Sequence, residues 1–215
     1  MQDFKELING LHCYSLANLK EINPSSKKNL EIDNGFKEIF HEIATHLMGK
    51  LCINIAGKHH RITECEIYYN DSESHQDPYP YGAAKSNCSL TEYQKECAKQ
   101  QVKKLHWFFH YSGLDITIGD DKKIIGGILI RSMQNVSGGP SKLCMNILND
   151  VFGSVFSLQN AQLFLEKYDC EERLDDIILS KRKGLDRGKE LTESNSLGNK
   201  SDLIFYERAY NYSIK

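Results

Sequence analysis

The stretch Leu51–Tyr69, LCINIAGKHHRITECEIYY, decides the fold. In its first five residues aliphatic side chains alternate with others, which is the pattern of a half-buried strand. Gly57 and Lys58 then predict a turn. A second strand is expected from Arg61 to Tyr69, so the stretch predicts a β-hairpin.

Helical periodicity appears on both sides of this hairpin. Apolar residues predict a helix from about Gly35 to Met48 and another within the first 20 residues. Ser89-Leu-Thr-Glu92 matches a capping box and predicts a helix that runs to about Leu105. A shorter helix is expected from Ser141 to Leu148, since a proline precedes it. The apolar positions of the first two helices are Phe4, Leu7, Ile8, Leu11, Phe36, Ile39, Phe40, Ile43, Leu47 and Met48.

Aromatic and β-branched segments predict six further strands. Together the elements predict an α+β fold, a single domain with a curved, mostly antiparallel β-sheet flanked by helices. We assign residues 1–34 to an N-terminal helical extension and residues 35–215 to the main domain. The six segments are His106–Tyr111, Leu114–Ile118, Ile124–Arg131, Gln162–Tyr168, Ile177–Ser180 and Leu203–Glu207.

Composition narrows the class of protein. The chain has 215 residues, of which 40% are hydrophobic and 26% charged, as is ordinary for a folded protein. It has no apolar run of the roughly 18–20 residues that span a bilayer, and no secretory signal pattern begins it. Seven scattered cysteines without a CxxC pair indicate reduced thiols. We therefore expect a cytoplasmic monomer with no membrane partner, no metal and no cofactor.

The second strand of the hairpin carries two carboxylates on one face. Alternation places Glu64, Glu66 and Tyr68 on the same side. Two acids beside a tyrosine do not make an ordinary core face, so this side is either exposed to solvent or lines a polar pocket. A pocket carboxylate that a neighbouring cation holds ionised can act as a general base toward water.

Six short segments form a collinear set of motifs: Ala44–Leu51, Arg61–Tyr68, Gly127–Arg131, Gly139–Cys144, Arg182–Leu185 and Leu203–Tyr206. The set resembles the alkyladenine (3-methyladenine) DNA glycosylase family. RITECEIY is similar to that family's catalytic strand R-I-V-E-T-E-A-Y, and GPSKLC matches its helix start. The other four are similar to its L-x-G-x-L, V-L-L-R, R-V-G-I and R-F-Y segments.

The resemblance implies a fold and a reaction. Residues 35–215 would be a glycosylase-like domain, similar also to the formyltransferase C-terminal-domain fold. Family members extrude a damaged purine nucleotide into a pocket. By this match Glu66 activates the water that attacks the sugar's anomeric carbon, and Arg131 helps to hold the water and the carboxylate. No lysine stands in a Schiff-base position, so a monofunctional hydrolase of alkylated or deaminated purines in base-excision repair is implied.

The same resemblance assigns residues to the base and to DNA. It implies a base-binding pocket of Tyr68, His75, Phe108 and Asp115, in which Phe108 replaces a stacking tyrosine and Asp115 replaces an asparagine that selects the base. Tyr111 takes the position of the residue that wedges into the DNA minor groove. Ser141 and Lys142 begin a helix, and backbone N–H groups beside an ammonium suit a phosphate.

Charge bears on which partner the chain binds. The net charge is −2, whereas most DNA-binding domains are basic. The best basic patch, around Lys181–Lys183, is typical of a solvated face. His106 and His110 could pair on a metal only in a helix, and their aromatic neighbours favour a strand. DNA, as damaged duplex or single strand, is the expected partner. A hydrolase of nucleosides or nucleotides and a non-catalytic binding module remain alternatives.

Overall fold

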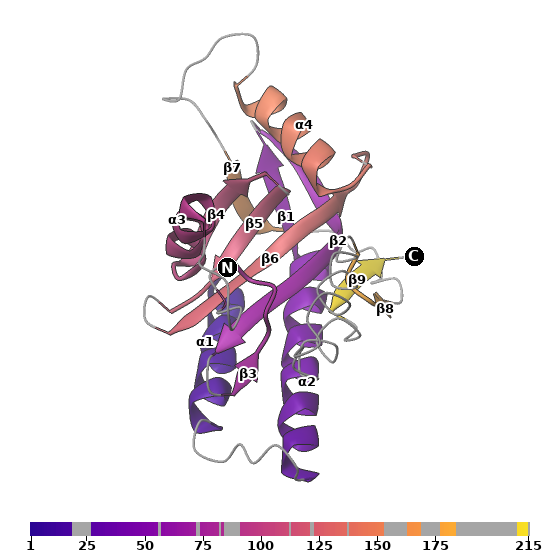
Figure 1. Cartoon of the computed structure of the whole chain (residues 1–215). Coiled ribbons are helices and arrows are strands. Elements are labelled where there is room, and N and C mark those ends of the chain that lie inside the picture. Colours follow the sequence, from indigo (N-terminus) through magenta and orange to yellow (C-terminus); the bar gives the residue numbers. More distant parts are fainter. Residues whose placement is uncertain are drawn as a thin grey trace.

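The computed structural model describes residues 1–18, 27–55, 57–71, 74–81, 83, 91–111, 113–120, 123–136, 138–152, 163–168, 177–183 and 210–214. Within these ranges the fold is α+β (Figure 1). The helices are α1 (Gln2–Ala17), α2 (Lys27–Lys50), α3 (Glu92–Gln101) and α4 (Pro140–Phe152). The strands are β1 (Leu51–Ile55), β2 (Lys58–Asp71), β3 (His75–Gln76), β4 (Lys104–His110), β5 (Gly113–Ile118), β6 (Ile124–Met133), β7 (Leu163–Lys167), β8 (Ile177–Ser180) and β9 (Asn211–Ile214).

The predicted hairpin is the centre of the sheet. Its path runs β4-β5-β6-β2-β1-β7, and every pairing between named strands is antiparallel. One edge of β2 pairs with β6 along most of its length. The other edge is shared in turn by β1, by β9 at Glu64–Glu66 and by β3 at Asn70 and Asp71. The long strand β2 therefore joins all parts of the sheet.

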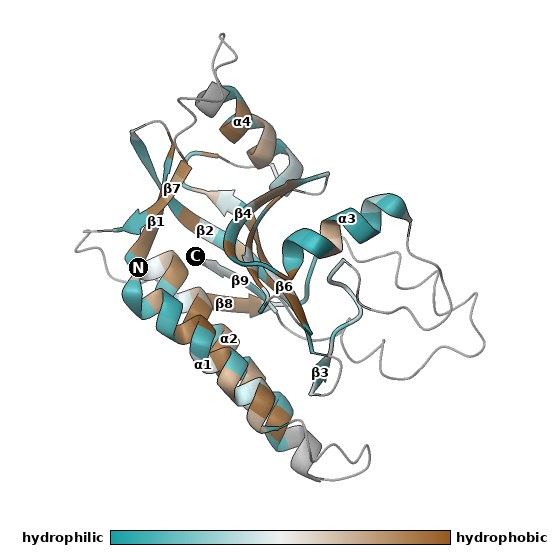
Figure 2. Cartoon of the chain, turned by 90° about the vertical axis from the view of Figure 1, so that its left-hand side faces the viewer, coloured by the Kyte–Doolittle hydropathy of each residue, from teal (hydrophilic) through white to brown (hydrophobic). Residues whose placement is uncertain are grey.

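The sheet is strongly curled. Trp107 of β4 donates its indole N–H to the carbonyl oxygen of Leu163 in β7 at 3.1 Å. These strands stand at opposite ends of the path, so the sheet must bend round into a half-barrel for them to meet (Figure 2). The prediction of a curved, antiparallel sheet flanked by helices is confirmed at this level.

The core lies between the sheet and the helix pair α1 and α2. The predicted apolar stripes turn inward, and Phe4, Phe36 and Phe40 are fully buried. On β2 the residues facing these helices are Cys65, Ile67 and Tyr69, all buried. Burying an aromatic side chain contributes about 2–3 kcal/mol, so this apolar face fixes which side of β2 faces inward. Glu64, Glu66 and Tyr68 consequently lie on the other face.

The N-terminal helix belongs to the same core. The predicted boundary between residues 34 and 35 falls inside α2, which is continuous. In addition, α1 packs closely on α2, because a Cβ at Gly35 would lie only 1.9 Å from the Tyr14 hydroxyl oxygen. The division into an extension and a main domain is therefore corrected, as far as the described residues show, to one packed unit.

The start of α3 differs from the predicted one. The capping box of α3 is formed by Thr91 and Gln94, with reciprocal bonds of 3.2 and 3.0 Å, rather than by Ser89 and Glu92. Ser89 itself and the predicted strand Leu203–Glu207 lie outside the described residues. In the described part of the chain no helix is long and apolar enough to cross a membrane.

Candidate active site

Cross-strand pairing assembles one row of predicted site residues. From β9 to β4 the successive partners are Asn211, Glu66, Leu129, Asp115 and Phe108. Directly opposed residues of an antiparallel sheet share a face. Glu66, Asp115 and Phe108 are distant in sequence, yet they lie along a single line on the side away from α1 and α2.

Arg131 reaches Glu66 because the ladder is irregular at this point. Glu64 pairs with Ser132 and Cys65 with Ile130, so Arg131 is left between two pairs. Such a bulge redirects a side chain locally. The Arg131 Nη1 atom lies 3.1 Å from Glu66 Oε1. The structure thus gives Arg131 an acidic partner, Glu66.

Glu66 is fully buried, and neutral donors add to the contact with arginine. The hydroxyl of Tyr68 donates to Glu66 Oε2 at 2.5 Å, and the backbone N–H of Lys183 donates to Oε1 at 2.7 Å. Burial and the charge of Glu66 raise the pKa of Tyr68 well above its ordinary value, so this hydroxyl stays a donor. The solvated reading of this face is therefore wrong for Glu66.

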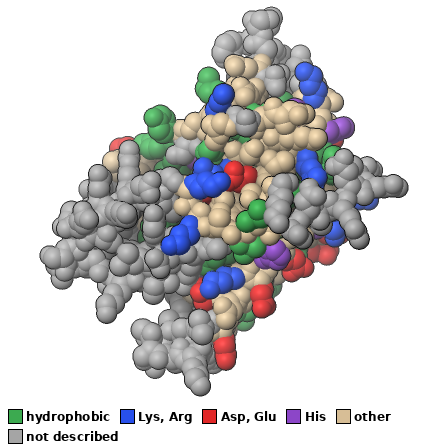
Figure 3. Space-filling model, turned by 90° about the vertical axis from the view of Figure 1, so that its right-hand side faces the viewer, with side chains coloured by type: hydrophobic (Ala, Val, Ile, Leu, Met, Phe, Trp, Pro, Cys, Tyr) green, Lys and Arg blue, Asp and Glu red, His purple; other side chains and the backbone are tan. Residues whose placement is uncertain are grey.

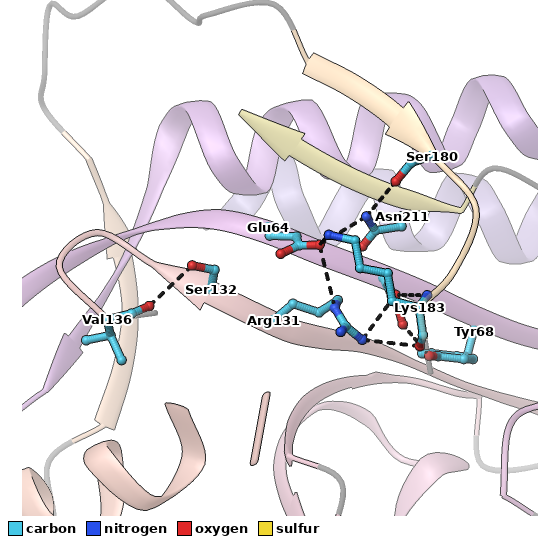
Figure 4. A network of polar contacts seen from close by, with 9 residues as sticks. Glu64, Tyr68, Arg131, Ser132, Val136, Ser180, Lys183 and Asn211 are labelled. Carbon is cyan, nitrogen blue, oxygen red and sulfur yellow. Dashed lines mark hydrogen bonds and ion pairs between the residues drawn. The ribbon is translucent and has the colours of Figure 1, made fainter. Parts of the chain in front are cut away.

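Glu64 completes a balanced group of charges beside Glu66. Lys183 Nζ lies 2.5 Å from Glu64 Oε1, and Asn211 Nδ2 donates to the same oxygen at 3.1 Å (Figure 4). Arg131 Nε lies 3.6 Å from that oxygen. Two carboxylates thus face two cations, and together these contacts fix the arginine between Glu64 and Glu66.

A second arginine, missed by the sequence analysis, supports this arrangement. Arg182 pairs with Asp77 at 2.7 and 3.3 Å, and both side chains are fully buried. Its guanidinium lies about 5 Å from the ring centres of Tyr68, Tyr79 and Tyr210. Burial acts to lower the pKa of Arg182, but the charge and hydrogen bonds of Asp77, together with Tyr68 and Tyr210, outweigh burial and the pKa is raised. The central residue of the presumed solvated patch is therefore an internal anchor, and it holds the neighbouring Lys183 over Glu66.

Asp115 and Phe108 belong to a polar and aromatic group beside α3. The Asp115 carboxylate accepts from Gln101 Nε2 at 3.0 Å and lies 3.1 Å from His110 Nε2. The Phe108 ring stacks on His110, with centroids 4.9 Å apart. A Cβ at Gly127 would lie 2.7 Å from Asp115 Oδ2, so the carboxylate occupies the space that a side chain would fill.

His75 lies in the core and not beside Glu66. Its ring centre is 4.5 Å from that of Phe36 and 5.5 Å from that of Phe40, both on α2. The reason is the pairing of β3, which sets His75 opposite Asp71 and hence on the same face as Tyr69. The predicted place of His75 in the base pocket is corrected accordingly.

The predicted DNA-contacting residues meet at one end of the sheet. Tyr111, at the tip between β4 and β5, is 88% exposed. The hydroxyl of Ser141, in the first turn of α4, donates to the Tyr111 carbonyl oxygen at 3.4 Å. Lys142 follows and is exposed. An exposed ring therefore lies next to a helix start and an ammonium group.

Charged side chains are scattered over the face drawn in Figure 3, with blue and red groups intermixed. Among the described residues no group of His, Cys, Asp or Glu could hold a metal ion. The sequence matches no protein-family model and no curated protein.

Proposed function

We propose that the chain is a divergent member of the alkyladenine DNA glycosylase family. In this proposal it is a monofunctional hydrolase that removes alkylated or deaminated purines from DNA in base-excision repair. The observation that carries the proposal is the buried Glu66 carboxylate, 3.1 Å from Arg131 on a strand that resembles the family's catalytic strand. The curled antiparallel sheet is compatible with that family's fold.

The surroundings of Arg131 suit a hydrolytic water. Its Nη1 atom lies 3.1 Å from Glu66 Oε1 and 3.5 Å from the Lys183 carbonyl oxygen. In this proposal a water takes the place of the Lys183 backbone N–H at Glu66 Oε1, donates one hydrogen to that oxygen and keeps a lone pair for the sugar carbon. Glu66 takes the proton as the bond to carbon forms, and its charge stabilises the cationic sugar of the transition state.

The DNA-facing part of the proposal rests on the end of the sheet near α4. Tyr111 is the wedge that fills the space left by the extruded nucleotide. The start of α4, with Ser141 and Lys142, binds a neighbouring phosphate. Because the net charge is −2, duplex binding relies on these local contacts and not on a basic surface.

A binding module that keeps the fold is the second candidate. The observation in its favour is that Glu66 is fully buried and already accepts bonds from Tyr68 and Lys183. Such a protein would bind an abasic or damaged site without cleaving it. A catalytic protein must instead open the contact with Lys183 when the substrate enters.

The test is release of free base from a duplex that contains one alkylated purine. We expect release by the wild-type chain and a loss of about 10²-fold or more in Glu66→Gln, which cannot take the proton. Glu64→Gln is the matched variant, on the same strand and face, and should lose less. Parallel reactions use the single strand and the free nucleoside.

Each result has a distinct meaning. Release from the nucleoside but not from the duplex would select the small-substrate hydrolase. Tight binding to a duplex with an abasic site, without release from any substrate, would select the binding module. A chain that neither binds nor cleaves these substrates would overturn the proposal.

A further inference from the structure

Lys183 contacts the surroundings of Glu66 through three of its own groups. Its backbone N–H donates to Glu66 Oε1 at 2.7 Å, and its carbonyl oxygen lies 3.5 Å from Arg131 Nη1. Its ammonium group binds Glu64, which lies two positions before Glu66 on the same face of β2 (Figure 4). A single residue therefore contacts the candidate general base, the arginine and the second acid at once.

These contacts close Glu66 to water. The Glu66 side chain is fully buried, its Oε2 atom accepts from Tyr68, and its Oε1 atom accepts from Lys183. Arg131 contacts Oε1 as well. In the proposed reaction a water takes the place of the Lys183 N–H at Oε1. Hydrolysis therefore requires that Lys183 first move away from Glu66.

Lys183 can move while its surroundings stay in place. The preceding residue, Arg182, is held by two bonds to Asp77, and both of these side chains are fully buried. The Lys183 side chain, by contrast, is 54% exposed, and an exposed ion pair is exchanged at little cost. Glu64 keeps its bond from Asn211 at 3.1 Å when the ammonium leaves. A rotation of the peptide between residues 182 and 183 is then enough to free Glu66.

A backbone phosphate of the substrate suits the ammonium of Lys183. Lysine binds phosphate as a point charge, and a phosphate oxygen offers the negative charge that Glu64 supplies in the closed site. Glu64 and Glu66 are two residues apart along β2, a distance of about 7 Å. The anomeric carbon of a nucleotide and the phosphates on the same sugar have a comparable separation. A sugar at Glu66 thus brings a phosphate within reach of Lys183.

We propose that Lys183 makes hydrolysis depend on a charged phosphate next to the damaged nucleotide. This inference rests on the proposed function. The phosphate takes the ammonium from Glu64, the Lys183 peptide turns away from Glu66, and a water enters at the freed Oε1 atom. A substrate without this charge leaves the site closed. Lys183 is thus a specificity-determining residue, which restricts the reaction to purine nucleotides within a DNA strand.

The test compares single-turnover rates at saturating protein on three duplexes, each with one 7-methylguanine. One duplex is native, and the others carry an uncharged methylphosphonate in place of the phosphate on the 5′ or the 3′ side of the lesion. With the wild-type chain, one of the two replacements should lower the rate by about 10-fold or more, the effect of one hydrogen bond between charged groups. Saturation removes differences in affinity, so the ratio of rates reports a step after binding.

Lys183→Met should abolish this difference. Without the ammonium the phosphate has no means of opening the site, so the rates on the native and replaced duplexes should agree within about 2-fold. Lys183→Arg keeps the charge and should restore a difference. Lys181→Met is the matched control, since it removes the same charge from an exposed position two residues away and should keep the wild-type ratio. Thermal unfolding checks that each variant folds.

The outcomes separate this inference from the proposed function. Equal rates of the wild-type chain on all three duplexes would overturn the inference alone. The inference also falls if Lys183→Met keeps the wild-type ratio, because the phosphate would then act through another residue. If the wild-type chain releases 7-methylguanine from none of the duplexes, the proposed function and the inference fall together.

Discussion

Two arginines of this protein each meet a buried carboxylate, and their surroundings differ. Arg182 forms two bonds to Asp77, is fully buried and lies among three tyrosine rings. Arg131 contacts Glu66 through one nitrogen, is 13% exposed and also approaches Glu64 and the Lys183 carbonyl. The first arginine binds its carboxylate through two nitrogens and is enclosed by aromatic rings. The second is shared among several acceptors, as suits a group that must rearrange around a substrate.

A buried ion pair is therefore not by itself a sign of catalysis. The Arg182–Asp77 pair has two hydrogen bonds and is fully buried. It acts on Glu66 only indirectly, because the residue next to Arg182, Lys183, donates its backbone N–H to Glu66. The Arg131–Glu66 pair is looser, yet it is the one that touches the candidate general base. Substitutions that separate stability from activity can test this division.

Arg182→Met should give the largest effect on stability. It leaves the Asp77 carboxylate buried without a cation, which costs about 3–5 kcal/mol. Chemical denaturation measures the loss. The double variant Arg182→Met with Asp77→Leu should recover much of it, since no unpaired charge remains. A single variant within about 1 kcal/mol of wild type would contradict the structural role of this pair.

Arg131→Gln should instead lose activity. Removing a positioned donor from a reacting centre typically costs about 10²-fold or more in rate. Arg131 is 13% exposed and Glu66 keeps its bonds from Tyr68 and Lys183, whereas the Arg182 pair is fully buried, so the loss of stability should be at most about half of that in Arg182→Met. Single-turnover base release and denaturation are measured on the same preparation. A larger loss of stability in Arg131→Gln, or a larger loss of activity in Arg182→Met, would contradict these roles of the two arginines.

Tyr68→Phe should give the smallest effect, visible in alkali. Tyr68 contacts both pairs, since its hydroxyl donates to Glu66 and its ring lies under Arg182. The pKa of Tyr68 is raised in the folded state. The contribution of its protonated hydroxyl to the free energy of unfolding is therefore complete below about pH 10, and it is lost as the pH rises toward the folded-state pKa. Without this tyrosine, the decline of stability above pH 10 should be shallower by up to about 1.4 kcal/mol per pH unit.

The alkaline prediction has a matched control. Tyr111→Phe removes a hydroxyl from an exposed tip and should leave the wild-type decline in place. A Tyr68→Phe variant with the wild-type decline would show that Tyr68 does not keep its proton beside Glu66. The buried Tyr69 and Tyr212 also have a raised pKa, so a decline of some size should persist in every variant.

The hairpin and the apolar stripe of α2 could be predicted from the sequence, because strand alternation and helical periodicity depend only on residues that are close together in the chain. The contact of Arg131 with Glu66 agrees with the general rule that a buried arginine needs an acid, but the rule alone does not choose between Glu66 and Asp115. The capping box was misplaced because Thr91 and Gln94 satisfy the same pattern as Ser89 and Glu92. The sequence contains both matches, and the capping-box pattern alone does not show which of them begins the helix.

The remaining errors concern pairing and backbone groups. The face of His75 depends on which strand β3 joins, and a one-position change of register reverses it. The hydrogen bond from Lys183 to Glu66 is donated by a backbone N–H, which every residue except proline carries. The identity of the side chain at position 183 therefore does not predict this bond. Arg182 looked like part of a solvated run because its partner Asp77 lies 105 positions away in the chain.

The irregular pairing around Glu64 consists of two one-residue offsets between β2 and β6. Thr63 on β2 and Arg131 on β6 are both skipped, and the pairs on either side, Ile62 with Met133 and Cys65 with Ile130, keep a common frame. The two slips cancel, so the distortion stays within one step of the ladder. Deleting either residue alone would invert the inward and outward sides of everything beyond it. Deleting both would restore a straight ladder with an intact core and without the arginine that meets Glu66.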